Sequence, residues 1–387
     1  MSVTDVSTPE EWALVRVWGT QRPMFEPIER RGDRWLLGRE TLANDDRMSR
    51  RHCEVRLGAG GWVIEDLGSA NGTHVNGAGW VGRRPGGPWQ VLQIGRSLVI
   101  PVSVVAGVPL RMHCDEDAIV GPGLYRCWEA VGDAAAGGAH VVLAGPPGCG
   151  FTMLARHHER VCGRAGSFTV HDLDQRKPLA VTVPPGVALV TGGGSLERFA
   201  MHPWIRAALR RHDLRLVLAL EWDPDDGTLK LPEPLSRFRV ITVPGLDARP
   251  EEIPWRIAAE VQAHAPTTAV DVTFPEACLL RLWGNGIPGL LAETRDAIGR
   301  ARQRDPDQAL LQARDLSEYA GLPTDQAAIG GLAPPSGPRW PAAQLADGTT
   351  VMRAVVAAGG DLRMAAARLG VPEATLEKWL RHHKTRP

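Results

Sequence analysis

Apolar and polar residues alternate in short segments along the first part of the chain. The segments RWLLGR, WVIEDL and QVLQIG show this two-residue period, and turn residues separate them. Successive side chains of a strand point to opposite faces of a sheet, so this period is typical of strands that bury one face. The pattern predicts an all-β sandwich between about residues 12 and 105.

The pattern changes from about residue 113, where buried strands begin to alternate with helices. In HVVLAGPPGCGFTMLARHHERV, it predicts a buried strand from His140 to Ala144, a glycine-rich turn and then a helix. We therefore expect an α/β core at about 113–248 and a helical lid at about 249–318.

The C-terminal part is predicted to hold a linker and a small helical unit. The stretch GLPTDQAAIGGLAPPSGPRWPAAQLADG is rich in Pro, Gly and Ala, which favours a linker, placed at 321–346. The segment 347–387 predicts three short helices, with Asp361 as a cap and Gly370 at a tight turn. The expected fold class is multidomain: a β-sandwich at 1–112, an α/β core with a lid at 113–320, and an all-α unit.

Length and charge limit the kinds of partner. A chain of 387 residues is long for one domain, so several compact units are expected. It has 44 basic and 44 acidic residues, so no overall field attracts it to nucleic acid and DNA contact requires a local patch. No apolar stretch of about 18 residues and no signal-peptide core occurs, so we expect a soluble, cytoplasmic protein without a membrane partner.

The six cysteines are scattered without a C-x-x-C pair. This spacing argues against a disulfide framework and against a zinc ribbon. The stretch HHERVC at 157–162 falls on a predicted helix, and we predict no metal site there.

The segment between Gly38 and Gly77 carries the polar groups that a receptor for phosphothreonine needs. Phosphothreonine has about −1.5 to −2 charges and three acceptor oxygens, so it requires a planar cation and neutral donors on rigid loops. Arg39 supplies the planar cation and Ser49 a hydroxyl donor. Arg50 or Arg51 adds charge, and Asn71 can bond the peptide main chain on either side of the phosphate; these five residues form the predicted phosphopeptide site.

The runs GRETLANDDRMSRRHCEV and EDLGSANGTHVNG resemble the forkhead-associated (FHA) domain. The resemblance implies phosphothreonine binding, with structural roles for Gly38 and His52. Gly72 suits a turn with positive φ, and Asn76 with the following glycine is a strong hairpin signal. The alternative is an ordinary β-sandwich with a surface arginine, but the order of these elements within a short span favours the FHA reading.

The glycine-rich turn after residue 144 resembles a P-loop that has lost its cation. A P-loop reads G-x-x-x-x-G-K-[ST], because the lysine reaches the phosphates and the hydroxyl holds Mg²⁺. Gly145, Gly148, Gly150 and Thr152 are present, but Phe151 takes the position of the lysine. No cofactor is therefore expected, although main-chain amides leave a route for residual ATP binding.

The same region resembles the AAA+ domain of bacterial enhancer-binding proteins, which act on the sigma-54 form of RNA polymerase. In GVALVTGGGSLERF, Gly192 and Gly193 stand where the family has acidic residues, and in WGNGIPGLLAETRDAI, Pro288 replaces the sensor arginine. No GAFTGA-like string occurs. The resemblance alone implies an ATPase, but these departures from the family pattern predict a pseudo-ATPase without catalytic residues, which does not remodel sigma-54 polymerase.

The C-terminal helices resemble the Fis-type helix-turn-helix of the same family, whose third helix enters the major groove of double-stranded DNA. The acidic Glu373 departs from the family pattern and either weakens binding or accepts from a cytosine. One unit with few basic residues binds weakly, so we expect a dimer on two half-sites, or else a helical unit that only dimerises. The candidate DNA-binding residues are Arg363, Arg368, Glu373, Ala374, Thr375, Lys378, Arg381 and Lys384.

Two functions compete at this point. The first is a phosphothreonine-responsive, DNA-binding transcription regulator, whose partners are a phosphothreonine-containing protein or segment, DNA and a second copy. The second is a phosphoprotein-binding adaptor that pairs with an intact enhancer-binding protein and does not read DNA. A third, an ATP-driven activator, is opposed by Phe151, Gly192 and Pro288.

Overall fold

The computed structural model describes residues 11–317, except 43, 59–60, 81, 87–90, 116, 164–166, 175–183, 193, 223–228, 282, 284 and 307–308. The predicted linker at 321–346 and the predicted helix-turn-helix at 347–387 lie outside the described residues. The chain divides into two compact units. Of the described residues, one unit contains those up to Met112, those between Pro250 and Gly284 and those from Pro288 to Ser317, and the other contains those from His113 to Arg249 and Asn285–Ile287.

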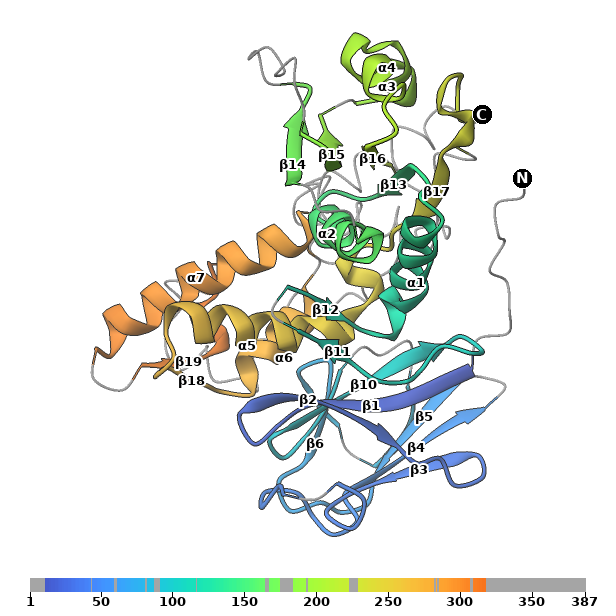
Figure 1. Cartoon of the computed structure of the whole chain (residues 1–387). Coiled ribbons are helices and arrows are strands. Elements are labelled where there is room, and N and C mark those ends of the chain that lie inside the picture. Colours follow the sequence, from blue (N-terminus) through green and yellow to red (C-terminus); the bar gives the residue numbers. More distant parts are fainter. Residues whose placement is uncertain are drawn as a thin grey trace, which may run out of the picture. The chain divides into compact units, whose positions relative to one another are not determined.

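The N-terminal part of the first unit is a sandwich of two antiparallel sheets (Figure 1). One sheet has the order β2-β1-β10-β9-β6-β7 and the other the order β3-β4-β5-β8. The strands are β1 (Glu11–Gly19), β2 (Arg22–Ile28), β3 (Arg34–Leu37), β4 (Cys53–Gly58), β5 (Gly61–Asp66), β6 (Thr73–Val75), β7 (Ala78–Trp80), β8 (Arg83–Gly86), β9 (Leu92–Ile94) and β10 (Ser97–Val104).

The sandwich forms because alternate side chains of both sheets meet in one apolar core. On β3, for example, Trp35 and Leu37 are buried, whereas Arg34 is exposed. The ring of Trp35 lies 5.6 Å from the ring of Trp62 on β5, and Val99 of the opposite sheet joins the same core. The β-sandwich predicted from the two-residue period is confirmed.

The second unit is built on a five-stranded parallel sheet with the order β14-β15-β16-β13-β17. Its strands are β13 (Val141–Gly145), β14 (Ser167–Asp172), β15 (Gly186–Thr191), β16 (Leu214–Glu221) and β17 (Arg239–Thr242). Its helices are α1 (Pro122–Ala136), α2 (Phe151–Cys162), α3 (Leu196–Met201) and α4 (Pro203–Ala208), with 3-10 turns at Leu235–Arg237 and Leu246–Ala248. A short antiparallel pair, β11 (His113–Cys114) and β12 (Ile119–Val120), precedes α1.

Both faces of this sheet are covered by helices. Val141 and Leu143 of β13 pack with α1 and α2, whereas Val142 and Ala144 of the same strand pack with α3 and α4. Burial on both faces explains why β13 reads as a continuous apolar run instead of an alternating one. The predicted P-loop NTPase-like α/β core is confirmed.

Helices from the later part of the chain group with the sandwich in the first unit. They are α5 (Ile253–His264), α6 (Thr273–Leu280) and α7 (Gly286–Arg304), the last of which begins in the second unit. Two short strands, β18 (Ala269–Val270) and β19 (Leu310–Leu311), form a parallel pair, and 3-10 turns occur at Pro250–Glu252 and Ala313–Asp315.

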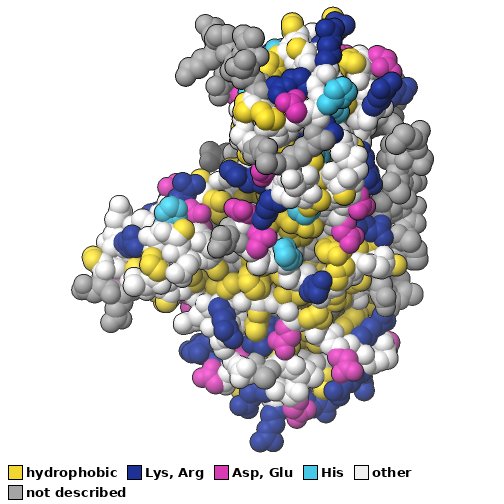
Figure 2. Space-filling view, in the orientation of Figure 1, with side chains coloured by type: hydrophobic (Ala, Val, Ile, Leu, Met, Phe, Trp, Pro, Cys, Tyr) yellow, Lys and Arg dark blue, Asp and Glu magenta, His cyan; other side chains and the backbone are white. Residues whose placement is uncertain are grey.

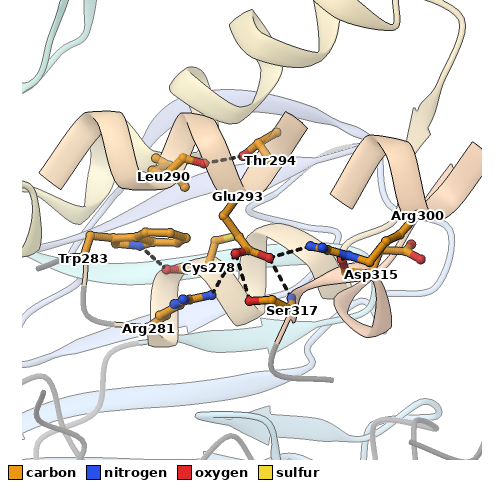
Figure 3. Close-up of polar contacts among 9 residues, drawn as sticks. All are labelled: Cys278, Arg281, Trp283, Leu290, Glu293, Thr294, Arg300, Asp315 and Ser317. Atoms are coloured by element: carbon orange, nitrogen blue, oxygen red, sulfur yellow. Dashed lines mark hydrogen bonds and ion pairs between the residues drawn. The ribbon is translucent and has the colours of Figure 1, made fainter. Parts of the chain in front are cut away.

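A carboxylate of α7 fixes the end of the described chain, as Figure 3 shows. Glu293 accepts hydrogen bonds from the backbone N–H of Ser317 at 2.6 Å and from its hydroxyl at 2.9 Å. It also pairs with Arg300 at 2.6 Å and with Arg281 at 3.8 Å. The segment that follows β19 is thereby held against α7.

Within the described ranges, no helix combines the length and the apolar character needed to cross a membrane.

Candidate functional site

The loop that joins β3 to β4 folds back on itself at Gly38. The backbone N–H of Arg39 donates to the carbonyl of Ser49 at 3.0 Å, and Glu40 donates in the same way to Arg50 at 3.3 Å. A Cβ atom at Gly38 would lie 2.1 Å from the carbonyl oxygen of Arg50. The loop therefore closes only with a glycine at this position, and closure brings Arg39 next to Ser49.

His52 ties this loop to the turn that precedes β6. It is fully buried. Its Nδ1 accepts the backbone N–H of Ser49 at 3.1 Å, and its Nε2 lies 2.9 Å from the carbonyl oxygen of Gly72. These partners assign the proton to Nε2. Gly72 has a φ of 77°, so the turn uses a conformation that favours glycine.

Two aspartates hold the surrounding turns. Asp66 accepts from the backbone N–H of Ser69 at 2.9 Å, from its hydroxyl at 2.7 Å and from the Thr73 hydroxyl at 2.5 Å. Burial opposes the charge of Asp66, but these hydrogen bonds outweigh it and hold its pKa below the usual value. Asp45 is buried and accepts from the backbone of Arg47 at 3.1 Å and from the hydroxyl of Ser97 at 2.8 Å.

The exposed groups of these loops include cations of the kind that can bind an anion. Arg39, Arg50 and Arg51 are exposed, and the Arg39 side chain has no hydrogen-bond partner among the described residues. The Ser49 hydroxyl oxygen accepts the backbone N–H of Ala70 at 3.0 Å, which leaves its own proton as a donor. Figure 2 shows basic side chains gathered around the lower end of the sandwich.

The last residue of the predicted phosphopeptide site, Asn71, is exposed but already engaged. Its side-chain nitrogen donates to the carbonyl of Arg47 at 2.6 Å, so it fixes the two loops to each other. Asn76 has a φ of 51°, and Gly77 after it has a φ of 77°, as expected for the predicted hairpin turn between β6 and β7. The structure thus places Arg39, Ser49 and Asn71 along one continuous rim.

The glycine-rich turn joins β13 to α2, where a P-loop lies in nucleotide-binding proteins. Gly145 ends β13, Gly148 has a φ of 68°, and Gly150 precedes the first turn of α2 with a φ of 107°. Phe151 begins α2 and packs against the apolar cluster between the sheet and α1. Thr152 is exposed.

The other positions that carry catalytic residues in the family hold uncharged residues here, and one of them lies outside the described residues. Gly192 follows β15 with a φ of 74°, Pro288 is an exposed residue of α7, and Gly193 is outside the described residues. Within the described parts, no group of three or more His, Cys, Asp or Glu residues is placed to hold a metal ion. All eight candidate DNA-binding residues, from Arg363 to Lys384, lie outside the described residues.

Sequence reasoning missed several residues that shape these loops. Asp45 and Asp66 were not selected, although the order Asp-x-x-Ser at Asp66 and Ser69 is a signal for a side-chain-capped turn. Arg249 was also missed. It is fully buried and donates to the carbonyl oxygens of Cys149 and Gly245, a role that no local pattern indicates.

Two family models match parts of the chain. Residues 35–90 match the FHA domain, and residues 120–174 match magnesium chelatase, subunit ChlI. The chain therefore carries an FHA domain followed by an AAA+-like domain. No curated protein sequence matches the chain.

Some solved structures are similar to about two thirds of the chain, and others to its FHA domain alone. NtrX from Brucella abortus in complex with ATP is 16% identical, with 67% of each chain covered and a TM-score of 0.41. A RuvB variant from Thermotoga maritima is 16% identical and covers 67% of this chain and 86% of its own, with a TM-score of 0.36. The FHA domain of FhaA is 28% identical and covers 24% of this chain and 99% of its own, with a TM-score of 0.20.

Proposed function

We propose that this protein is a phosphothreonine-responsive, DNA-binding transcription regulator related to sigma-54 enhancer-binding proteins, with an AAA+ domain that does not hydrolyse ATP. The FHA domain captures a phosphothreonine in a partner protein or segment. The C-terminal unit reads DNA, and the AAA+ domain supports both modules without chemistry of its own.

The observation that carries the proposal is the rim formed by Arg39, Ser49 and Asn71. The backbone of the exposed Arg39 is bonded to that of Ser49, whose hydroxyl proton is available, on loops that hydrogen bonds of the buried His52 hold in place. A planar cation with rigid neutral donors matches a phosphate ester with three acceptor oxygens. Hydrogen bonds already hold the backbone of these loops in the free structure, so binding costs little backbone entropy.

The proposal that the AAA+ domain does not hydrolyse ATP rests on uncharged residues at the expected catalytic positions. Phe151 packs into the apolar cluster and brings no charge to the phosphates, and Gly192 and Pro288 offer no metal ligand and no sensor cation. Phosphoryl transfer depends on such electrostatic groups. We expect no Mg-ATP turnover by the purified protein, and turnover that Thr152→Ala abolishes would contradict this part of the proposal.

The test of the phosphothreonine site compares two arginine variants. Wild type should bind a degenerate phosphothreonine peptide library in fluorescence anisotropy and should ignore the matching threonine library. Arg39→Ala should weaken binding by about tenfold to a hundredfold, because it removes charge-assisted hydrogen bonds worth about 1.5–3 kcal/mol. Arg22→Ala replaces an exposed arginine at the start of β2; it is the matched control and should bind as wild type does.

The two outcomes separate clearly. If Arg39→Ala and Arg22→Ala bind equally well, or if wild type does not distinguish phosphothreonine from threonine, the phosphothreonine site is not at this rim. If phosphopeptide binding holds but the full chain shows no specific DNA binding at near-physiological salt, the protein is the adaptor instead.

A further inference from the structure

A backbone N–H from the start of α7 binds a carbonyl oxygen of the loop between β13 and α2. The N–H of Ile287 donates to the carbonyl oxygen of Gly148 at 2.9 Å. Asn285–Ile287 lies far along the chain but belongs to the same compact unit as this loop. A segment from the start of α7 is therefore part of the glycine-rich turn.

The fit at this contact depends on Gly286. A Cβ atom at Gly286 would lie 2.5 Å from the carbonyl oxygen of Gly148 and 2.7 Å from that of Pro147, and Gly286 has a φ of 56°. A Cβ atom at Gly150 would lie 3.4 Å from the side chain of Ile287. The two backbones thus touch without room for a side chain between them.

A buried cation holds the same loop at the next residue. Arg249 is fully buried, donates to the carbonyl oxygen of Cys149 and lies 3.3 Å from that of Gly245. A Cβ atom at Gly245 would lie 2.9 Å from the ring of Pro146. Consecutive carbonyls of the loop, at 148 and 149, are therefore both bound by groups of the protein.

The position that carries the acidic residue in enhancer-binding proteins is filled as well. A Cβ atom at Gly192 would lie 2.1 Å from a carboxylate oxygen of Asp172, which comes from the end of the neighbouring strand β14. Asp172 also accepts the backbone N–H of Asp174 at 3.0 Å, so it helps to form the turn after β14. A side chain at 192 would have to displace the carboxylate of Asp172.

We propose that the loop from Gly145 to Gly150 is a structural joint, whose carbonyl oxygens bind the chain's own segment Asn285–Ile287. The joint uses carbonyl oxygens of the loop, whereas a phosphate binds N–H groups. The joint is therefore independent of nucleotide binding and goes beyond the proposed function. It keeps Asn285–Ile287 on the α/β core.

The test uses two glycines of α7 that differ in their surroundings. Gly286→Ala should lower the Tm by several degrees and should raise hydrogen exchange in the first turn of α2 by about tenfold or more, because the joint opens. Gly299→Ala is the control, since a Cβ atom there would meet no described atom within 4 Å. It should leave exchange in α2 unchanged. Unchanged exchange in folded Gly286→Ala would overturn the joint.

A milder variant and a turnover measurement cover the remaining outcomes. Ile287→Ala keeps the N–H donor and trims the contact over Gly150, so it should raise exchange less than Gly286→Ala does. Mg-ATP turnover by wild type would contradict the proposal that the AAA+ domain does not hydrolyse ATP but leave the joint standing, because phosphate binds N–H groups of such a loop and the joint uses its carbonyl oxygens.

Discussion

At the scale of single residues, Gly38 is the position on which the geometry of the phosphothreonine site depends most. We expect Gly38→Ala to destabilise the FHA domain by about 1–3 kcal/mol, because its Cβ would meet the carbonyl oxygen of Arg50 at 2.1 Å and force the loop apart. Phosphopeptide affinity should fall with it, since Arg39 moves away from Ser49. Thermal unfolding and fluorescence anisotropy measure the two effects.

The matched control for this prediction is Gly79→Ala. Gly79 is an exposed residue of β7, and a Cβ there would meet no described atom within 4 Å. Its replacement should change stability by less than about 0.5 kcal/mol and leave binding intact. Equal effects of the two substitutions would show that Gly38 does not close the loop.

Glu276 makes the stability of the protein depend on pH. Burial raises the pKa of this α6 carboxyl to about 7, and the neighbouring charge of Asp271 adds to the rise. Between pH 4.5 and about 7 the folded state therefore holds a proton that the unfolded state releases. The stabilisation that comes from the protonated Glu276 is complete below pH 4.5 and is lost as the pH rises through about 7.

We expect Glu276→Gln to remove most of this dependence. The amide keeps the shape of the side chain and has no proton to lose, so the gap in stability between pH 5.5 and pH 8 should shrink by about 1–3 kcal/mol. Thermal unfolding at both pH values measures the gap. The same gap in wild type and variant would mean that Glu276 does not titrate in this range.

The sequence predicted the residues that carry local signals and missed those that act across the fold. Arg39, Ser49, His52 and Asn71 could be selected because their order within a short span is specific. Asp45 could not, since its partner Ser97 is distant in sequence and only the folded sandwich brings the two together at 2.8 Å. Buried polar residues of this kind have no periodic pattern.

At the scale of elements, Glu293 determines how the segment after β19 is held. Its side chain is mostly buried and serves Arg281, Arg300 and Ser317 together (Figure 3). Glu293→Ala should destabilise the first unit by about 1–3 kcal/mol, because both arginines and both donors of Ser317 lose the carboxylate that they share. Hydrogen exchange at Ser317 should rise for the same reason. Asp296→Ala, an exposed position on the same helix, is the control and should have little effect on either.

The pattern of the chain predicted the long elements and missed the short ones. The apolar run at β13 and the helix after it were evident, because a fully buried strand leaves a continuous apolar run and an amphipathic helix leaves a periodic pattern. The pair of β18 and β19 has two residues in each strand and joins segments that are distant in sequence, so no local period reveals it. The grouping of α5 and α6 with the sandwich depends on tertiary packing, which the sequence pattern does not encode.

At the scale of the whole molecule, the net charge of zero makes the proposed DNA binding dependent on a few side chains. Each phosphate contact adds about one counterion to the salt dependence of binding. Replacing Lys378 and Arg381 together by Ala should therefore weaken DNA binding at every sequence and reduce the slope of log K against log salt by about 2. An unchanged slope would place the phosphate contacts elsewhere or favour the adaptor.

The link between phosphothreonine and DNA can be tested in one molecule because the two predicted sites are far apart in sequence. Arg39→Ala should leave DNA affinity unchanged when no phosphopeptide is present, since it alters only the FHA rim. With saturating phosphothreonine peptide, wild type should change its DNA affinity and Arg39→Ala should not, because a ligand shifts an equilibrium only through the site that binds it. If wild type captures the peptide and its DNA affinity stays the same, the two modules are uncoupled, and phosphothreonine recruits a partner to DNA without altering how DNA is bound.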